Sequence, residues 1–574
     1  MESETKTCQN CKNSFVIEPD DFSFYEKIKV PPPTFCPECR LQRRFAWRNE
    51  CIFYKTKCGL CKKNTITNNP PLSNFPIYCS ECWHGDKWEA RDYGKDYDFS
   101  KPFFLQWKEL LERTPNINLW GIGNLNSEYS NYTGYSKNIY LSNATNCEDV
   151  YYSRLVDRSK NLVDCYYTTG SEFCYENFIT KKIYNSSFLN NCSDCVDSYF
   201  LFDCKNCSNC FMCSNLRNKN YYIRNKQYTR ETYGEELKNY KLSSFKKLEE
   251  YKSEFDNLIK EKIHKFANIT NSVDVTGDNI INSKNTHDCF MVEGENLKYC
   301  WRCFNKIKDS YDITGGLNNE LCYESSLAAD GGYMTKFFSH SRGNKNSDLV
   351  HLCINCSNIF GCVGLKNKKY YILNKEYSKE EYTELIPKII KHMNDMPYID
   401  SKGRVYKYGE FFPSELSPFN YNDTVAQEFF PLIKEKVLDE GYKWEEKEQR
   451  NYIVDIKSED IEDDINNIDI GICDKIIECG HLDNNKHTDV CKSSCTEAFK
   501  ITKEEFQFYK RMNLPLPRLC ANCRYGERIK QRNPPKLWHR KCMNKGCNNE
   551  FETSYAPERP EIIYCEYCYQ KEVY

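Results

Sequence analysis

Residues 136–170 read SKNIYLSNATN, CEDVYYSRLVDR and SKNLVDCYYTTG, three consecutive lines of nearly equal length. Each line begins with Ser or Cys, continues with an apolar or aromatic group and ends in polar residues that suit a turn. The pattern continues to residue 218 as SEFCYENFITKKI, YNSSFLNNCSD, CVDSYFLFDCKN and CSNCFMCSNLRN. A repeat this short cannot hold a helical hairpin, so it predicts short strands stacked in a β-solenoid.

A second array of such lines begins near Gly277 (GDNIINSKNTHD) and ends with CSNIFGCVGLKN. The ends of the two arrays are related, because residues 207–228 match residues 356–377 at 14 of 22 positions. We therefore expect a two-part solenoid with halves at 126–228 and 273–377. Small apolar groups suit the inward positions of such coils, and a free Cys behaves as one.

Cysteines recur every third residue at Cys204, Cys207, Cys210 and Cys213, which could also indicate an iron–sulfur cluster. The second array keeps only Cys353, Cys356 and Cys362 in the corresponding region, where Ile359 replaces the equivalent of Cys210. A duplicated cluster should not lose a ligand, so core packing is the favoured interpretation.

Paired cysteines mark both ends of the chain. Three intervals between successive pairs, of 25, 19 and 18 positions, are the same at the two ends, which indicates one unit used twice. Two such pairs can surround one zinc ion, and a site of four cysteines with no open position is structural. We predict about four structural Zn²⁺ per chain, held by Cys8, Cys11, Cys36, Cys39, Cys58, Cys61, Cys79, Cys82, Cys491, Cys495, Cys520, Cys523, Cys542, Cys547, Cys565 and Cys568.

Disulfides or free buried thiols are the alternative interpretation of these pairs. The third group departs from the x2 spacing at Cys491-x3-Cys495, and the fourth departs at Cys542-x4-Cys547. The third group also has rival ligands close in sequence, namely Cys473, Cys479, His481 and His487.

The residues between the cysteines match as well: Phe15, Ile17, Phe22, Phe24, Tyr25, Pro31 and Pro33 correspond to Phe499, Ile501, Phe506, Phe508, Tyr509, Pro515 and Pro517. The pattern Cys-x2-Cys-x3-Phe, Asp/Glu-Phe-x-Phe-Tyr, then Pro before Cys-x2-Cys-Arg resembles the "probable zinc-ribbon" family of bacterial proteins. Three longer stretches are similar to large proteins of reduced-genome (candidate phyla radiation) bacteria, with zinc ribbons at both ends and a Cys-rich repeat middle: KLWHRKC (536–542), YAPERPEIIYCEYCYQKEVY (555–574) and YGEFFPSELSPFNYNDTVAQEFFPL (408–432). The resemblance implies zinc binding and carries no established activity.

The composition of the 574 residues favours a cytoplasmic protein with reduced thiols. The N-terminal MESETKTCQN has no apolar stretch of a secretory signal, and no apolar run is long enough to span a membrane. Lys plus Arg (80) balances Asp plus Glu (82), so net charge excludes little.

We predict a mainly β chain with added helices (α+β), in which terminal zinc-ribbon pairs flank the two-part β-solenoid. Helical segments at 229–272 and 378–396 should cover the solenoid ends, with a kink or break near Pro387. The remaining divisions are ribbon pairs at 1–100 and 471–574, a helical linker at 101–125, an aromatic and Pro-rich extended arm at 397–452 and an acidic connector at 453–470.

The expected function is a non-catalytic, zinc-dependent binding or scaffold role toward an unknown protein partner or nucleic acid, with no small-molecule substrate identified. Nucleic-acid binding would use basic and aromatic residues after the knuckles, namely Arg43, Arg44, Trp47, Arg48, Arg528, Lys530, Arg532 and Trp538. Arginines there could instead neutralise zinc-bound thiolates, a role that suits Arg40 and Arg524 best. A carbohydrate-cleaving solenoid is less favoured, because Asp194, Asp197 and Asp203 are candidates only by proximity.

Overall fold

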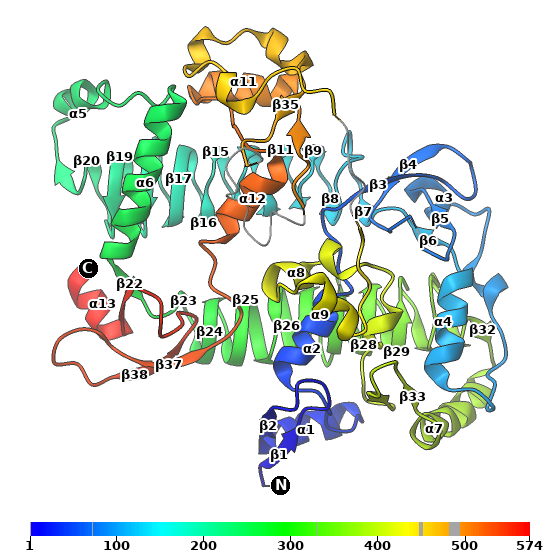
Figure 1. Ribbon diagram of the computed structural model, residues 1–574. Helices are drawn as coiled ribbons and strands as arrows, with labels where there is room; N and C mark the ends of the chain where they lie inside the picture. Colours follow the sequence, from blue (N-terminus) through cyan, green and yellow to red (C-terminus); the bar gives the residue numbers. More distant parts are fainter. Residues whose placement is uncertain (1, 72, 329, 447–451, 482–493) are drawn as a thin grey trace.

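Two parallel β-solenoids lie side by side and run in opposite directions, with zinc-ribbon-like lobes and helices around them (Figure 1). This computed structural model describes residues 2–71, 73–328, 330–446, 452–481 and 494–574. The mainly β class with helices and the central two-part solenoid are as the sequence predicts.

The first solenoid pairs its parallel strands at a constant offset. Lys160 aligns with Glu172, and Glu172 aligns with Tyr184 one coil later. The final hairpin, β20 with β21, is antiparallel. The strands are β7 (Gly121–Ile122), β8 (Thr133–Gly134), β9 (Lys137–Tyr140), β10 (Ala144–Thr145), β11 (Glu148–Tyr151), β12 (Arg154–Asp157), β13 (Lys160–Val163), β14 (Tyr166–Thr169), β15 (Glu172–Tyr175), β16 (Phe178–Lys181), β17 (Tyr184–Ser193), β18 (Tyr199–Phe202), β19 (Ser208–Ser214), β20 (Asn220–Ile223) and β21 (Lys226–Gln227).

A unit of three positions, used four times, underlies each of these coils. Asn161, Asp164, Tyr167 and Gly170 all have φ between 51° and 62°. The residue after each of them points inward, and Leu162, Cys165, Thr168 and Ser171 are at most 3% exposed. A coil is therefore a four-cornered turn. The abundance of Asn and Asp follows, because these residues tolerate the left-handed conformation better than most.

The triplet explains why solenoid cysteines recur every third residue. Cys204, Cys207, Cys210 and Cys213 occupy successive inward positions and are at most 1% exposed. Inner Ser and Cys also bond to the next coil: Ser159 Oγ accepts the N–H of Ser171 at 3.1 Å, and Cys192 Sγ accepts that of Cys204 at 3.4 Å. Burial raises the pKa of Cys165 to about 12, so this thiol stays protonated. These features fit core packing.

The second solenoid repeats this architecture with less regular coils. Its parallel strands align Val273 with Lys284, Tyr311 with Tyr323 and Tyr323 with Lys336, so the length of a coil changes along the array. The strands are β23 (Ile269–Thr270), β24 (Val273–Ile281), β25 (Lys284–Lys298), β26 (Trp301–Leu317), β27 (Tyr323–Ala328), β28 (Tyr333–Ser341), β29 (Lys345–His351), β30 (Ser357–Phe360), β31 (Lys369–Ile372) and β32 (Lys375–Glu376). Each solenoid begins slightly before the predicted boundary, at β7 and β23.

Helices follow each solenoid. After the first come α5 (Arg230–Leu237) and α6 (Phe245–Glu261), and after the second comes α7 (Lys379–Asp395). Helix α7 runs on through Pro387, so the predicted break is absent. Helix α4 (Phe103–Arg113) lies in the predicted helical linker. None of the helices in the described ranges combines the length and the apolar character needed to cross a bilayer.

The four terminal lobes each place a short β-hairpin before a helix that begins at a cysteine. Their elements are β1 (Glu4–Thr7), β2 (Ser14–Ile17), α1 (Pro19–Ile28) and α2 (Pro37–Phe45) in the first; β3 (Tyr54–Lys57), β4 (Asn64–Thr67), β5 (Ile77–Tyr78) and α3 (Ser80–His84) in the second; β35 (Ile477–Glu478), β36 (Ala498–Phe499), α11 (Lys503–Met512) and α12 (Ala521–Ile529) in the third; and β37 (Trp538–Lys541), β38 (Glu550–Thr553), β39 (Ile562–Tyr564) and α13 (Glu566–Val573) in the fourth.

The segments between these parts are packed against them. Phe411 and Phe412 of the aromatic arm are fully buried, and Asp463 of the acidic connector bonds to the Ser244 hydroxyl. Remaining elements are β6 (Asn116–Ile117), β22 (Ile263–Lys265), β33 (Tyr398–Ile399), β34 (Val405–Tyr406), α8 (Val425–Phe429) and α9 (Lys434–Asp439), with 3₁₀ turns at Ala90–Tyr93, Ser414–Leu416, Tyr421–Asp423, Ser458–Asp460, Ile465–Asn467 and Ile470–Asp474.

Candidate metal centres

Four groups of four cysteines gather in the terminal lobes. Within each group all sulfur atoms lie within 4.8 Å of one another. The groups are Cys8, Cys11, Cys36 and Cys39; Cys58, Cys61, Cys79 and Cys82; Cys479, Cys495, Cys520 and Cys523; and Cys542, Cys547, Cys565 and Cys568. The solenoid cysteines of the described residues form no such group.

All four groups share one backbone geometry. Cys36, Cys79, Cys520 and Cys565 are the N-caps of α2, α3, α12 and α13. The N–H of each donates to the first sulfur of its own group at 3.3 Å, and the acceptors are Cys8, Cys58, Cys479 and Cys542. Amide donors and a helix N-terminus both stabilise negative charge on sulfur.

Within the groups the pKa is lowered at some cysteines, such as Cys58 and Cys565, and raised at their partners, such as Cys79 and Cys542. Burial acts to raise the pKa of Cys58, but backbone N–H groups of Cys79 and Cys61 lower it to about 6. For Cys565 burial likewise opposes the shift, and the Cys568 N–H and the Asn549 side chain lower the pKa to about 7. Thiolates in sets of four are the ligands that a closed tetrahedral metal site requires, and zinc or iron fits such a set.

The third group contains one cysteine that the spacing did not assign to it. Cys479 stands with Cys495, Cys520 and Cys523, in the place that the spacing assigned to Cys491. The hydrogen bond that the first cysteine makes across the hairpin is the same in the first and third ribbons. The Cys479 N–H donates to Glu497 O at 2.8 Å, and the Cys8 N–H donates to Asn13 O at 2.9 Å. The knuckle is therefore Cys479-x15-Cys495, with a long insertion inside the turn.

Of the other rival ligands, Cys473 and His481 take other places. His487, like the predicted ligand Cys491, lies outside the described residues. Cys473 packs near the Thr502 carbonyl, and the imidazole of His481 faces Glu527 at 3.7 Å. A sequence signal for Cys479 did exist, because Cys479-Gly480 matches Cys58-Gly59, and both glycine N–H groups donate to a carbonyl before the second knuckle.

The predicted basic face after the first ribbon is wrong, because its residues are buried. Arg43, Arg44, Trp47 and Arg48 are at most 2% exposed. Arg43 Nη2 lies 3.0 Å from Glu324, Arg44 Nη1 lies 2.9 Å from Asp312, and Arg48 Nε lies 2.6 Å from Glu50. Trp47 packs on Phe412. Side chains enclosed in this way cannot reach phosphates or bases in the folded protein.

The C-terminal residues predicted for the nucleic-acid-binding surface differ in their exposure. Arg528 is 4% exposed and lies 2.7 Å from Asp164, while the Arg532 guanidinium stacks on Phe429 and lies 3.5 Å from Glu428. Trp538 is half-buried beside Lys536. Of these four residues only Lys530 is exposed, and its ammonium lies 2.6 Å from Glu527.

Arg40 and Arg524 both donate hydrogen bonds to carboxylates of the solenoids. Arg40 Nε donates to Asp312 at 3.0 Å, and Arg524 Nε donates to Asp164 at 2.7 Å. The arginines after each knuckle therefore dock a ribbon on a solenoid through enclosed ion pairs, a role that needs partners distant in sequence.

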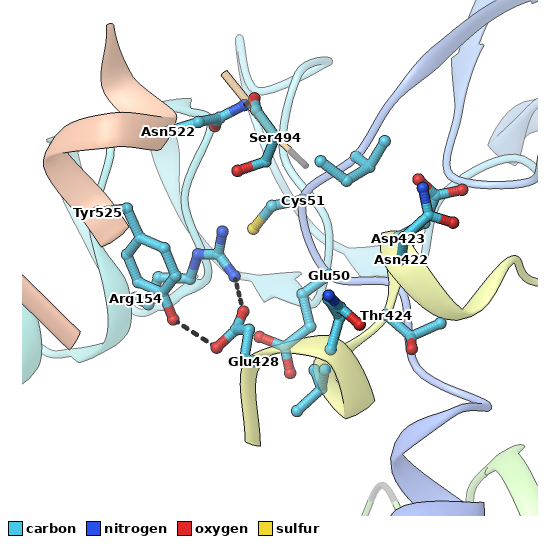
Figure 2. A pocket seen from close by; sticks show the side chains of 13 residues that line it. Glu50, Cys51, Arg154, Asn422, Asp423, Thr424, Glu428, Ser494, Asn522 and Tyr525 are labelled. Carbon is cyan, nitrogen blue, oxygen red and sulfur yellow. Dashed lines mark hydrogen bonds and ion pairs between the residues drawn. The ribbon is translucent and has the colours of Figure 1, made fainter. Parts of the chain in front are cut away.

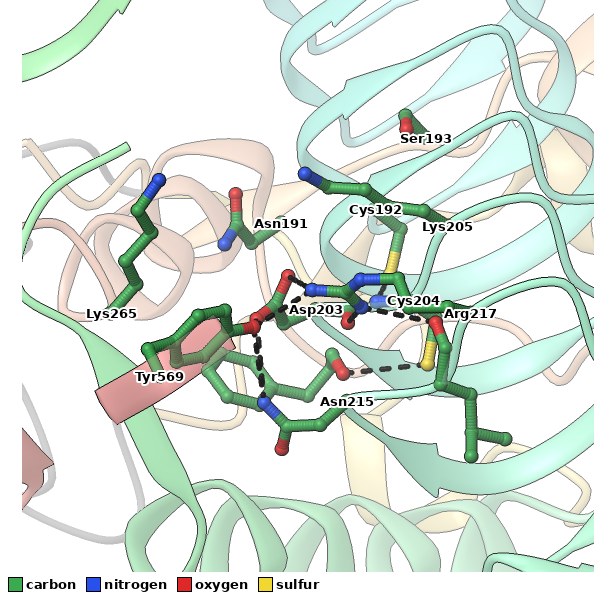
Figure 3. Close-up of polar contacts among 12 residues, drawn as sticks. Asn191, Cys192, Ser193, Asp203, Cys204, Lys205, Asn215, Arg217, Lys265 and Tyr569 are labelled. Carbon is green, nitrogen blue, oxygen red and sulfur yellow. Dashed lines mark hydrogen bonds and ion pairs between the residues drawn. The ribbon is translucent and has the colours of Figure 1, made fainter. Parts of the chain in front are cut away.

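The three acidic candidates all occupy left-handed corner positions, and the φ angles of Asp194, Asp197 and Asp203 are 54°, 47° and 48°. Asp194 is exposed, whereas Asp203 is enclosed with Arg217, Asn215 and Tyr569 (Figure 3), and its carboxylate lies 3.0 Å from Arg217. Burial raises the pKa of Asp203 to about 6, although Arg217 acts against that shift.

A cavity of about 50 Å³ lies among residues 50–52, Arg154 of the first solenoid, the segment around α8, and Asn522 and Tyr525 of the third ribbon (Figure 2). Its charged groups are engaged with each other: Glu428 accepts from Arg154 at 3.2 Å and from the Tyr525 hydroxyl at 2.9 Å. Burial raises the pKa of Cys51 to about 12, so its thiol is a poor nucleophile. The cavity has room for a few water molecules.

Comparisons with known proteins identify no relative from which a role could be inferred. No family model and no curated protein matches the chain. One solved structure, described as a "putative acetyltransferase" from Desulfovibrio desulfuricans, matches 52% of this chain and 84% of that chain, with 10% identity and a TM-score of 0.09. A likeness that low carries no argument about fold or activity.

Proposed function

We propose that this chain is a non-catalytic zinc-binding scaffold of the cytoplasm, whose two solenoids present surfaces to a protein partner. The supporting observation is the four closed cysteine groups, since each offers four sulfurs and lies in a lobe packed against the solenoids. Zinc bound there would be structural, because four thiolates leave no coordination position for substrate.

The metal would supply the lobes with the stability that their small cores cannot. The first lobe has only short strands and two helices around its cysteine pairs. Binding four deprotonated cysteines to zinc couples metal affinity directly to folding of such a unit. The solenoids, with their own buried interiors, would depend on the metal only through the docked lobes.

Elemental analysis of natively purified protein tests the ligand sets. We expect about four zinc per chain, and about one fewer in Cys39→Ser or in Cys479→Ser. Cys204→Ser, which changes a solenoid cysteine, is the matched control and should retain all of the metal. Full metal content in Cys39→Ser, or S–S bonds mapped between the grouped cysteines, would refute the proposal. Affinity capture of the intact protein would then identify the partner.

A second candidate function is nucleic-acid binding through the second ribbon. Lys55, Lys57, Lys62 and Lys63 are exposed on its hairpin, and residues 53–80 contain no Asp or Glu. In the fourth ribbon, by contrast, Lys541 and His539 pair with glutamates of the facing strand. Steeply salt-dependent retention on an RNA column that Lys55→Glu/Lys57→Glu abolishes would favour this candidate, and salt-insensitive flow-through would reject it.

A further inference from the structure

The ribbons dock on the solenoids in crossed order. The N-terminal ribbon packs on the second solenoid, where Tyr25 and Tyr323 form an edge-to-face pair with ring centroids 5.5 Å apart. The third ribbon packs on the first solenoid, where Tyr509 and Tyr175 form the same pair, also at 5.5 Å. Figure 1 shows α2 against the lower solenoid and α12 against the upper one. The first and third ribbons thus pack on opposite halves of the solenoid pair.

The two docking faces are nearly identical in chemistry. On the second solenoid, Asp312 receives Arg40 and Arg44, and the Arg40 guanidinium lies over the Tyr299 ring at 5.2 Å. On the first solenoid, Asp164 receives Arg524 and Arg528, with the Arg524 guanidinium over the Tyr152 ring at 4.8 Å. These contacts alone therefore do not distinguish one ribbon from the other.

One of the charged positions that follow the knuckle differs between the two ribbons. Arg43 of the first ribbon is 1% exposed and pairs with Glu324 at 3.0 Å and with Glu410 at 3.2 Å. The third ribbon has Glu527 at the equivalent place after its knuckle, and that side chain is 38% exposed and pairs with Lys530.

The two solenoids differ in which part of the chain supplies the cation for the equivalent glutamate. Glu176 follows Tyr175 as Glu324 follows Tyr323, but Glu176 is paired at 3.0 Å with Lys252 of α6. Among the described residues, the cations that form ion pairs with Glu324 are Arg40, Arg43 and Arg44, all from the first ribbon. The first solenoid therefore carries its own counter-ion, and the second depends on the ribbon for one.

We propose that Arg43, through its pair with Glu324, determines which ribbon docks on the second solenoid, while the first solenoid needs no such cation because Lys252 already pairs with Glu176. A third ribbon seated on the second solenoid would bring Glu527 toward Glu324 and supply no replacement for Arg43. A first ribbon seated on the first solenoid would bring Arg43 toward Lys252. Like charges without partners in an enclosed contact disfavour both wrong pairings. The inference stands whichever metal the cysteines hold.

Hydrogen exchange of the full-length protein tests this pairing. We expect Arg43→Glu to raise the exchange of α1 and α2 amides about tenfold or more, because the ribbon loses its docked state while its own fold persists. Glu324→Lys should do the same, because it also places a cation beside Arg40 and Arg44. Zinc content, unchanged throughout, separates undocking from unfolding of the lobe.

Glu527→Lys is the matched control, since it reverses the charge at the equivalent exposed position and should leave exchange of α11 and α12 within about twofold. Wild-type exchange of α1 and α2 in Arg43→Glu or in Glu324→Lys would overturn the proposal. If Arg43→Glu does not accumulate in a folded form, Arg43→Met with and without Glu324→Gln makes the same comparison without charge reversal. Protection in Arg43→Met equal to wild type would again contradict it.

Discussion

At the scale of single residues, burial decides the chemistry of the charged groups. In the sequence alone, the arginines after the cysteine knuckles resemble a nucleic-acid-binding surface. In the folded chain, Asp312, Glu324 and Asp164 enclose them. Asp203 shows the same effect on a carboxyl group, because burial outweighs the nearby Arg217 and raises its pKa to about 6. Charge type alone does not predict accessibility.

Asp203 should make stability depend on pH. Its pKa rises from an ordinary 3.8 to about 6 on folding, so the folded state holds the proton more tightly. The stabilisation is complete below pH 3.8 and is lost as pH rises through 6. Relative to Asp203→Asn, the wild type should lose about 1 kcal/mol of unfolding free energy between about pH 5 and about pH 7. Urea denaturation at both pH values measures this, and identical pH dependence in the two proteins would contradict it.

At the scale of elements, a triplet with one left-handed residue builds every regular coil. Asn161 has φ 55° and Asp164 has φ 57°, and the residue after each is buried. The period of the repeat is visible in sequence because it is the sum of four such triplets. The triplet itself is harder to recognise, since Tyr167 and Phe173 occupy left-handed positions that Asn and Asp usually take.

A β-branched residue at a left-handed corner should strain the coil. We expect Asn161→Ile to cost about 1–2 kcal/mol of unfolding free energy, because Cβ approaches the following carbonyl at φ 55°. Lys160→Ile, one position earlier in the exposed start of β13, should change stability by at most about 0.5 kcal/mol. Thermal or urea unfolding compares the two variants. Equal effects would show that the corner is not strained.

At the scale of the whole molecule, the first and third ribbons each dock on the solenoid that lies farther from them in the sequence. The first ribbon reaches the second solenoid and the third ribbon reaches the first, so each lobe bridges parts far apart in sequence. Asp312 and Asp164 are completely buried beneath these lobes. A lobe that unfolds would leave carboxylates without their cations, which disfavours the closed arrangement.

Removal of metal should therefore open the molecule without destroying the solenoids. Treatment with a thiol reagent and chelator should increase the radius of gyration in small-angle scattering, while the strand signal in far-ultraviolet circular dichroism persists. Reduction and addition of zinc should reverse the change. An unchanged radius after complete metal release would show that the lobes do not hold the halves together.

The sequence by itself determined the repeat, the two-part solenoid and the terminal cysteine lobes. These features are local: a coil closes within four triplets, and a cysteine knuckle with its hairpin and helix occupies one short stretch of chain. Only the tertiary structure decided that Cys479 stands where Cys491 was expected, that the arginines are enclosed, and that the ribbons cross over. Those outcomes depend on partners such as Asp312, 272 positions from Arg40, and Asp164, 360 positions from Arg524. Spacing along the chain carries no information about which distant charge a folded surface will bring opposite.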